Sequence, residues 1–285
     1  MKFLTVILSI ILGALVAGQS NAQWVQTTLP GFTGTSHALL VSGTNLFAGT
    51  DSGGVFLSTN NGTSWTAVNT GMGLADRYVW AMTATSYNVL VGTSGATYVS
   101  TNNGANWTST SGSGGVSAFA MSVSNLVSTN VFAGAGGGVF LSTNNGAVWK
   151  LVKTGLTTTD VRALAVSDTN IFAGTFGGGV FLSTNNGSKW TAVGTSQMDG
   201  SVRALLFSGR NLFAGTGNGV YVSSDKGSNW TSVSSGLETV GYVDALAAST
   251  TNLYAGTWSG GVFLSTNNGT NWTSISTNLV ANGPV

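Results

Sequence analysis

Apolar residues in this chain occur in short runs separated by Gly, Asn, Asp, Ser and Thr. Four such runs follow one another at Val161–Ser167 (VRALAVS), Asn170–Thr175 (NIFAGT), Gly178–Ser183 (GGVFLS) and Lys189–Val193 (KWTAV). Each run is rich in β-branched or aromatic residues and is bounded by turn-forming residues, which is typical of strands. No helical period appears between them. The short connections predict a four-stranded antiparallel meander.

This unit occurs six times. A Ser-x-Asn-x-Gly-x-x-Trp string marks each copy, and successive copies of its first residue are 40 to 42 positions apart. These serines are Ser58, Ser100, Ser142, Ser183, Ser223 and Ser265. A period of this length with four strands per unit is typical of a β-propeller, in which sheets are repeated around a ring. We predict an all-β fold, a propeller of six four-stranded antiparallel blades over residues 23–285.

The number of blades has one alternative. Gln23–Phe32 (QWVQTTLPGF) resembles an additional fourth strand, with Trp24 in the place of Trp65. The last unit already has its own fourth strand at Asn271–Ile275 (NWTSI), and Asn282–Val285 (NGPV) resembles the approach to another first strand. The alternative is therefore an incomplete ring of seven blades.

We interpret the repeated string as architecture. A short side-chain oxygen such as that of Asn60 accepts backbone N–H bonds in a tight turn, and Gly62 permits a positive φ. Trp65 would then anchor the fourth strand by burying a large ring. An amide cannot serve as a general acid, and six copies around a ring cannot converge on one substrate. The structural residues predicted in this way are Ser58, Asn60, Gly62, Trp65, Trp107, Trp149, Trp190, Asp225, Trp230 and Trp272.

The string resembles the Asp-box, also called the bacterial neuraminidase repeat. That repeat occurs in the propellers of sialidases, xyloglucanases, sortilin-type receptors and photosystem II assembly-factor-like proteins. The resemblance implies the propeller fold, but the functions of these proteins are too diverse to imply one activity. Asn replaces the acid in five copies, and only Asp225 retains it. The five are Asn60, Asn102, Asn144, Asn185 and Asn267.

The first 22 residues have the pattern of a bacterial secretory signal peptide. A positive start at Met1-Lys2 precedes the apolar run Phe3–Val16, and Ser20-Asn21-Ala22 resembles a cleavage site. The apolar run is shorter than the ~20 residues that a spanning helix needs. We therefore expect cleavage after Ala22, a secreted or periplasmic protein, and no membrane insertion.

Charge and composition limit the partners, metals and cofactors that we expect. Only 6% of the residues are charged and the net charge is +1, so nucleic acid is not an expected partner. The chain has no cysteine and one histidine, His37. We accordingly expect neither a metal site nor a cofactor.

Positions that differ between copies are free to serve a function. At the start of the innermost strand, a different side chain occupies the same position in most units. Neighbouring turns between the second and third strands place further variable residues on the same face of the ring. The predicted ligand-binding set at the mouth of the central channel is His37, Trp80, Ser117, Arg162, Arg203, Asp244, Asp51, Phe176 and Trp258. Aromatic surfaces with scattered polar groups suit a sugar or a peptide.

Our leading hypothesis is a secreted, non-catalytic propeller that binds a protein or glycan at this face, with no catalytic residue. One alternative is a sialidase-like glycoside hydrolase. The resemblance would then assign substrate or catalytic roles among Arg77, Arg162, Arg203, Glu238, Tyr242 and Asp244, although the Arg-Ile-Pro motif of sialidases is absent. The other alternative is a repeat fragment of a larger surface or sensor protein.

Overall fold

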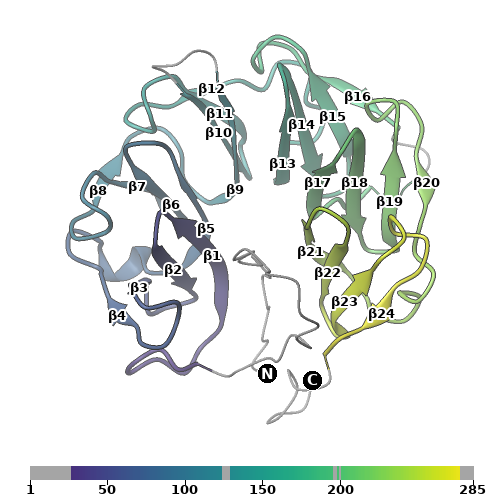
Figure 1. Ribbon diagram of the computed structural model, residues 1–285. Helices are drawn as coiled ribbons and strands as arrows, with labels where there is room; N and C mark the ends of the chain where they lie inside the picture. The colour runs from purple at the N-terminus through teal and green to yellow at the C-terminus, as the bar shows by residue number, and fades with distance from the viewer. Residues whose placement is uncertain (1–26, 124–128, 195–197, 199, 277–285) are drawn as a thin grey trace.

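The computed structural model describes residues 27–123, 129–194, 198 and 200–276. Within them, 24 strands form six four-stranded antiparallel sheets set around a central axis (Figure 1). This confirms the predicted six-bladed β-propeller. The expected signal peptide over residues 1–22 lies outside the described residues, as do residues 282–285. No helix in the described part of the chain is long and apolar enough to cross a membrane.

The strands follow the repeat. The first three blades consist of β1 Ser36–Ser42, β2 Asn45–Thr50, β3 Val55–Ser58, β4 Thr66–Ala67; β5 Val79–Ala84, β6 Val89–Thr93, β7 Thr97–Ser100, β8 Thr108–Thr110; and β9 Val116–Val123, β10 Thr129–Ala135, β11 Gly138–Ser142, β12 Lys150–Leu151. The last three consist of β13 Val161–Ser167, β14 Asn170–Thr175, β15 Gly179–Ser183, β16 Thr191–Val193; β17 Ala204–Ser208, β18 Asn211–Thr216, β19 Gly219–Ser223, β20 Thr231–Ser232; and β21 Val243–Ala248, β22 Leu253–Thr257, β23 Gly261–Ser265, β24 Thr273–Ser274. A short 3-10 helix, η1 Leu74–Asp76, lies before β5.

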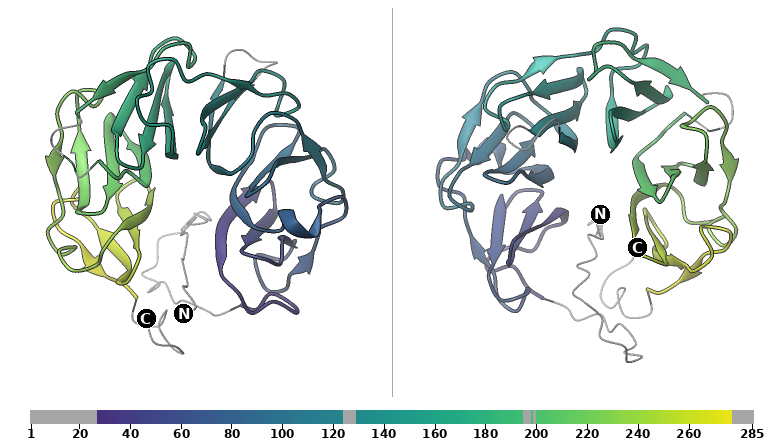
Figure 2. Two further views of the ribbon diagram at one scale, coloured as in Figure 1. Left: turned by 180° about the vertical axis from the view of Figure 1, so that it is seen from behind. Right: turned by 45° about the horizontal axis from the view of Figure 1, so that its top comes forward.

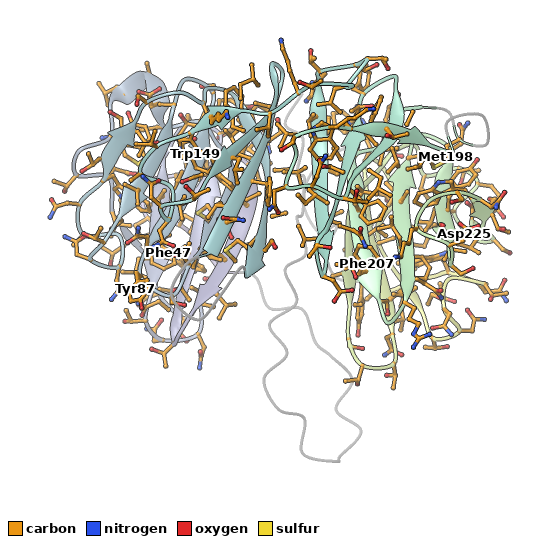
Figure 3. The ribbon with its side chains drawn as sticks, turned by 90° about the horizontal axis from the view of Figure 1, so that it is seen from above. Phe47, Tyr87, Trp149, Met198, Phe207 and Asp225 are labelled. Carbon is orange, nitrogen blue, oxygen red and sulfur yellow. The ribbon has the colours of Figure 1, made fainter. Side chains whose placement is uncertain are left out.

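Each blade is a meander in chain order. The first strand of every blade lines the inside of the ring and the fourth lies at the outside (Figure 1). Viewed from above in Figure 3, Met198 of the link before β17 and Tyr87 of the turn between β5 and β6 lie toward opposite rims. The links between blades and the turns between first and second strands therefore belong to opposite faces of the ring.

The core lies between consecutive blades. The second strand of a blade points one large apolar side chain at the following blade, and Phe47, Phe132 and Phe172 at this position are 0% exposed. Tyr98 and Trp107 of the second blade pack against Phe47 in the same cluster. Truncating a ring buried in this way typically costs about 3–5 kcal/mol.

The repeated string closes the turn between third and fourth strands as we predicted. The Ser58 hydroxyl donates to Asn60 Oδ1 at 2.9 Å, and the same oxygen accepts the N–H of Ser64 at 2.9 Å. Asn61 and Gly62 take left-handed φ values of 54° and 82°. All six copies repeat these bonds, with Asp225 Oδ1 accepting the N–H of Asn229 at 2.8 Å.

The tryptophan of the string also joins neighbouring blades, which the sequence analysis did not anticipate. Trp107 Nε1 donates to the carbonyl of Val68 at 2.7 Å, across the boundary with the preceding blade. Val68 comes three positions after Trp65, the preceding blade's own tryptophan. The bond from Trp190 to Val152 repeats this spacing at 2.8 Å. The indoles of Trp107, Trp149, Trp190 and Trp272 are therefore each fixed by a hydrogen bond as well as by burial.

Among the described residues, the ring is open between its first and last blades. The innermost strands pack in succession from β1 to β21, but within the described residues β21 and β1 do not pack together in this way. Figures 1 and 2 show this opening between β1–β4 and β21–β24. The extra fourth strand expected over Gln23–Phe32 does not form across residues 27–32. Within the part of the chain that the structure describes, no third strand of a preceding blade pairs with these residues.

Candidate binding site at the channel mouth

The variable position at the start of the innermost strand is set by a β-bulge. In β13, Val161 pairs with Thr175 and Ala163 with Gly174, so Arg162 is an extra residue in the strand. Equivalent bulges occur at His37, Trp80, Ser117 and Asp244. Arg203 directly precedes β17, and its N–H donates to the carbonyl of Gly215 at 2.9 Å. A bulge changes the direction of a side chain locally, which suits these positions to contacts outside the sheet.

The turn between second and third strands lies beside this position. Phe176 N–H donates to the carbonyl of Asp160 at 2.9 Å, and Trp258 N–H donates to that of Tyr242 at 2.9 Å. Asp51 N–H makes the corresponding bond to Thr35 at 3.0 Å. These bonds fix the turn residues Asp51, Phe176 and Trp258 next to the innermost strands. The two predicted sets therefore share one face, as the topology implied.

An arginine cluster occupies this face over the last three blades. Arg203 is its centre, with its guanidinium carbon 3.8 Å from the ring centroid of Tyr242. The rings of Phe176 and Trp258 lie 5.9 Å and 5.8 Å from the same carbon. Arg162 approaches Phe176 from the neighbouring blade at 5.8 Å. We call Arg162, Phe176, Arg203, Tyr242, Asp244 and Trp258 the arginine cluster.

Asp244 is the acid of this cluster. Its Oδ1 lies 2.9 Å from Arg203 Nη1, and its side chain is only 13% exposed. Burial raises the pKa of Asp244, while the hydrogen bond and charge of Arg203 lower it in part. Asp244 Oδ2 is buried and has no hydrogen-bond partner among the described residues. Because this oxygen is buried, a ligand's N–H or O–H group would have to displace neighbouring side chains to reach it.

Arg162 is held by a separate acid. Its Nε and Nη2 donate to the two carboxylate oxygens of Asp160 at 2.7 Å and 2.8 Å. This bidentate pair is more exposed than the pair of Arg203 and Asp244. Both arginines of the cluster therefore have their charge matched within the chain.

A second group of aromatic residues lies over the first two blades. The ring of Trp80 is 4.5 Å from that of Tyr78 and 4.9 Å from that of His37. Burial lowers the pKa of His37, and the nearby carboxylate of Asp51 opposes this shift. Burial of the Tyr78 hydroxyl, together with the charge of Asp51, raises the pKa of Tyr78. Both groups are thus uncharged near neutral pH, and we call His37, Tyr78 and Trp80 the aromatic cluster.

Seven of the nine predicted site residues thus fall into two clusters, and Asp51 and Ser117 lie outside them. Ser117 holds the equivalent bulge position in β9, between them along the chain. Sequence reasoning missed Tyr78 for this face and gave Tyr242 only a catalytic role. Both tyrosines lie two positions before the variable position at the start of the innermost strand, which Trp80 and Asp244 occupy in their blades. Comparing the copies at that earlier position would have found them.

Three large apolar side chains of this face are open to solvent. Trp80 is 38% exposed, Phe176 42% and Trp258 46%. Across the described residues, no three potential metal ligands among His, Asp and Glu gather in one place. What the face offers to a ligand is aromatic surface and fixed ion pairs.

These features define a β-propeller with an aromatic and arginine-bearing face. The model of a family described as the DUF6242 beta propeller domain matches residues 123–239, less than half of the chain. A search of curated proteins finds no match.

Solved propeller structures are similar in fold. The extracellular domain of BT4673 from B. thetaiotaomicron superposes with a TM-score of 0.69 at 17% identity, covering 85% of this chain and 34% of that one. The GH74 enzyme of Niastella koreensis gives 0.64 at 18% identity, covering 84% and 44%. YCF48 bound to D1 peptide gives 0.66 at 14% identity, covering 89% and 84%. This chain therefore spans about a third of the length of the BT4673 extracellular domain and less than half of that of the GH74 enzyme.

Proposed function

We propose that this protein is a secreted, non-catalytic binding module that holds a protein ligand at the channel-mouth face. The observation that carries the proposal is the exposure of Trp80, Phe176 and Trp258 on one face, beside arginines whose charges are already matched. Exposed aromatic residues next to paired polar groups are typical of binding surfaces. A rigid ring presenting variable residues suits recognition, because the scaffold fixes where they lie.

A protein of similar structure supports a peptide as the ligand. YCF48, which has the same fold, is described in complex with a peptide. An extended peptide could place apolar side chains against the exposed rings of Phe176 and Trp258. A glycan would use the same aromatic surfaces through its sugar rings, and is the outcome that our test separates from a peptide.

Glycoside hydrolysis is the competing function, and one observation favours it. Burial raises the pKa of Asp244, as a proton-donating carboxyl group requires. Hydrolysis would also need a second carboxylate within about 5–10 Å. Asp160 is occupied by Arg162, and Glu238 accepts the N–H of Gly236 at 3.0 Å. These partners are the reason that we place hydrolysis second.

The test screens the purified protein against a peptide library, a glycan array and glycoside reporter substrates. We expect peptide binding without turnover. Replacing Trp80, Phe176 and Trp258 together by Ser should abolish it, since central aromatic residues often contribute 2 kcal/mol or more each. The control is Tyr87→Ser, an aromatic residue 68% exposed on the opposite face, which should bind normally. Binding to glycans but not to peptides would show that the ligand is a glycan. Turnover of a reporter substrate that is lost in Asp244→Asn would show that the protein is a glycoside hydrolase.

A further inference from the structure

Five copies of the repeated string contain an Asn-Gly pair, the dipeptide in which an asparagine most readily loses its side-chain amide. The glycine nitrogen attacks the side-chain carbonyl carbon, ammonia leaves, and a succinimide ring forms. Water then opens the ring to aspartate or isoaspartate. Glycine favours this reaction because it has no Cβ to hinder the approach. The five asparagines are Asn61, Asn103, Asn145, Asn186 and Asn268, and Lys226 replaces them in the fifth copy.

Burial does not keep water from these asparagines. Four of them are exposed, and Asn145 is partly buried. What the turn fixes instead is the direction of the glycine nitrogen. All five asparagines have φ values of 54–56°, in the left-handed region, where ψ is typically about +47°. At this ψ the next nitrogen lies nearly opposite Cβ across the Cα–C bond, so ring closure requires a large rotation about that bond.

The serine of the string holds the glycine nitrogen in this direction. Gly187 N–H donates to Ser183 Oγ at 2.9 Å, and the Ser183 hydroxyl donates onward to Asn185 Oδ1 at 2.9 Å. Ser183 is 1% exposed, so water does not compete for these bonds. Rotation of the nitrogen toward the side chain of Asn186 would break the bond to Ser183 and remove a partner from a buried hydroxyl.

The same bond recurs in every copy of the string. The glycine N–H lies 2.8–2.9 Å from the serine oxygen in all six, and each of the six serines is at most 2% exposed. The fifth copy keeps the bond from Gly227 to Ser223 although Lys226 has no amide to lose. The bond therefore belongs to the turn itself, and the five Asn-Gly pairs share its chemical consequence.

We propose that the serine of the repeated string protects the adjacent Asn-Gly pair from deamidation, in addition to closing the turn. The turn prevents ring closure, which is the first step of the reaction, even where water reaches the asparagine freely. The five pairs are thus modification sites that the folded protein keeps inactive. The serines that protect them are Ser58, Ser100, Ser142, Ser183 and Ser265.

Ser183→Ala in the full chain tests the proposal. We expect Asn186 to convert to aspartate and isoaspartate at least about tenfold faster than in the unchanged chain, because its glycine nitrogen loses a buried acceptor. Incubation in mildly alkaline buffer followed by peptide mapping with mass spectrometry measures all five sites in one molecule. The other four asparagines should keep their rates. An unchanged rate at Asn186 overturns the proposal.

The fifth copy supplies the matched control. Ser223→Ala removes the same bond one blade further along the chain, beside Lys226 instead of an asparagine. It should leave the rates of all five asparagines as they are. If it accelerates Asn186 as much as Ser183→Ala does, the cause is a general loss of stability and the proposal is wrong.

Lys226→Asn tests the protection with every serine in place. Lys226 already has a φ of 60°, so the substitution suits the turn. The introduced Asn-Gly pair should deamidate as slowly as the five native pairs, and at least about tenfold faster when Ser223→Ala is added. Deamidation in Lys226→Asn alone at the rate of the urea-unfolded chain would show that the serine gives no protection.

Discussion

Arg203 and Asp244 form an ion pair between two neighbouring blades, with Nη1 and Oδ1 2.9 Å apart. Arg203 belongs to the start of the fifth blade and Asp244 to the first strand of the sixth. The ring of Tyr242 covers the guanidinium group, with its centroid 3.8 Å from the guanidinium carbon. The pair thus links the binding face to the packing of the ring, and Arg203 has both a structural role and a proposed binding role.

Removal of Arg203 should destabilise the protein through Asp244. We expect Arg203→Ala to lower the free energy of unfolding by about 3 kcal/mol, because it leaves a largely buried carboxylate without its partner. Arg162→Ala, which breaks a more exposed pair, should cost about 0–1 kcal/mol. Denaturant unfolding of both variants measures the difference.

The double variant Arg203→Ala/Asp244→Ala is the control. It should recover part of the stability lost in Arg203→Ala, since the unpaired charge is removed as well. Equal costs for Arg203→Ala and Arg162→Ala would show that Asp244 does not depend on its partner.

His37 should make stability depend on pH. Burial holds the pKa of His37 below its usual 6.5 in the folded state. Its contribution is therefore fully present above the unfolded value and is lost as the pH falls through the folded value. The protein should lose stability between pH 7.5 and pH 5, and His37→Gln should remove this part of the loss.

Because His37 is the single histidine, its NMR titration reports the pKa directly. A titration at or above 6.5 would contradict the prediction. Parallel urea unfolding of the protein and of His37→Gln at the two pH values gives the stability difference.

Asp225 allows the acid and amide forms of the repeated string to be compared within one chain. The backbone N–H of Asn229, followed by its side-chain amide and the Ser223 hydroxyl, lowers the pKa of Asp225. The carboxylate therefore stabilises the fold above its usual pKa of 3.8, and this contribution is lost as the pH falls through the lower folded value.

Asp225→Asn should fold normally, as the five Asn copies do, with a small decrease in Tm at pH 7. The Tm difference from the unchanged protein should shrink as the pH is lowered below about 4, where the carboxylate becomes protonated. The reverse change Asn267→Asp should raise Tm at pH 7 and lose this gain in acid. A Tm difference that does not change with pH would rule out the charge as its cause.

The repeat made the fold and the turn chemistry predictable. Six aligned copies showed which positions every blade requires, such as Asn60 and Gly62, and which vary, such as Trp80 and Asp244. Strand order and the shared face of the variable residues then followed from the meander. These features depend on local sequence, which a repeat displays several times over.

Contacts between blades were not predictable in the same way. The pairing of Arg203 with Asp244 and the bond of Trp65 to Thr27 join residues 41 and 38 positions apart. Spacing alone does not say whether two such side chains meet, because that depends on how the blades twist and pack.

The link between the third and fourth blades requires a glycine at position 155. Gly155 has a φ of 91°, and a Cβ there would overlap the carbonyl oxygen of Trp190. The backbone cannot easily move away, because Trp190 N–H donates to the carbonyl of Thr154 at 2.9 Å. Gly155→Ala should therefore cost about 3 kcal/mol or more, combining left-handed strain with a clash against backbone.

Gly209→Ala separates the two contributions. Gly209 also has a positive φ, 60°, but a Cβ would meet nothing within 4 Å. We expect a cost of about 1–2 kcal/mol there, from the left-handed conformation alone. Denaturant unfolding of the two variants compares them directly. If both cost the same, the contact of Gly155 with Trp190 would contribute nothing, and the link between these blades could relax around a side chain without loss.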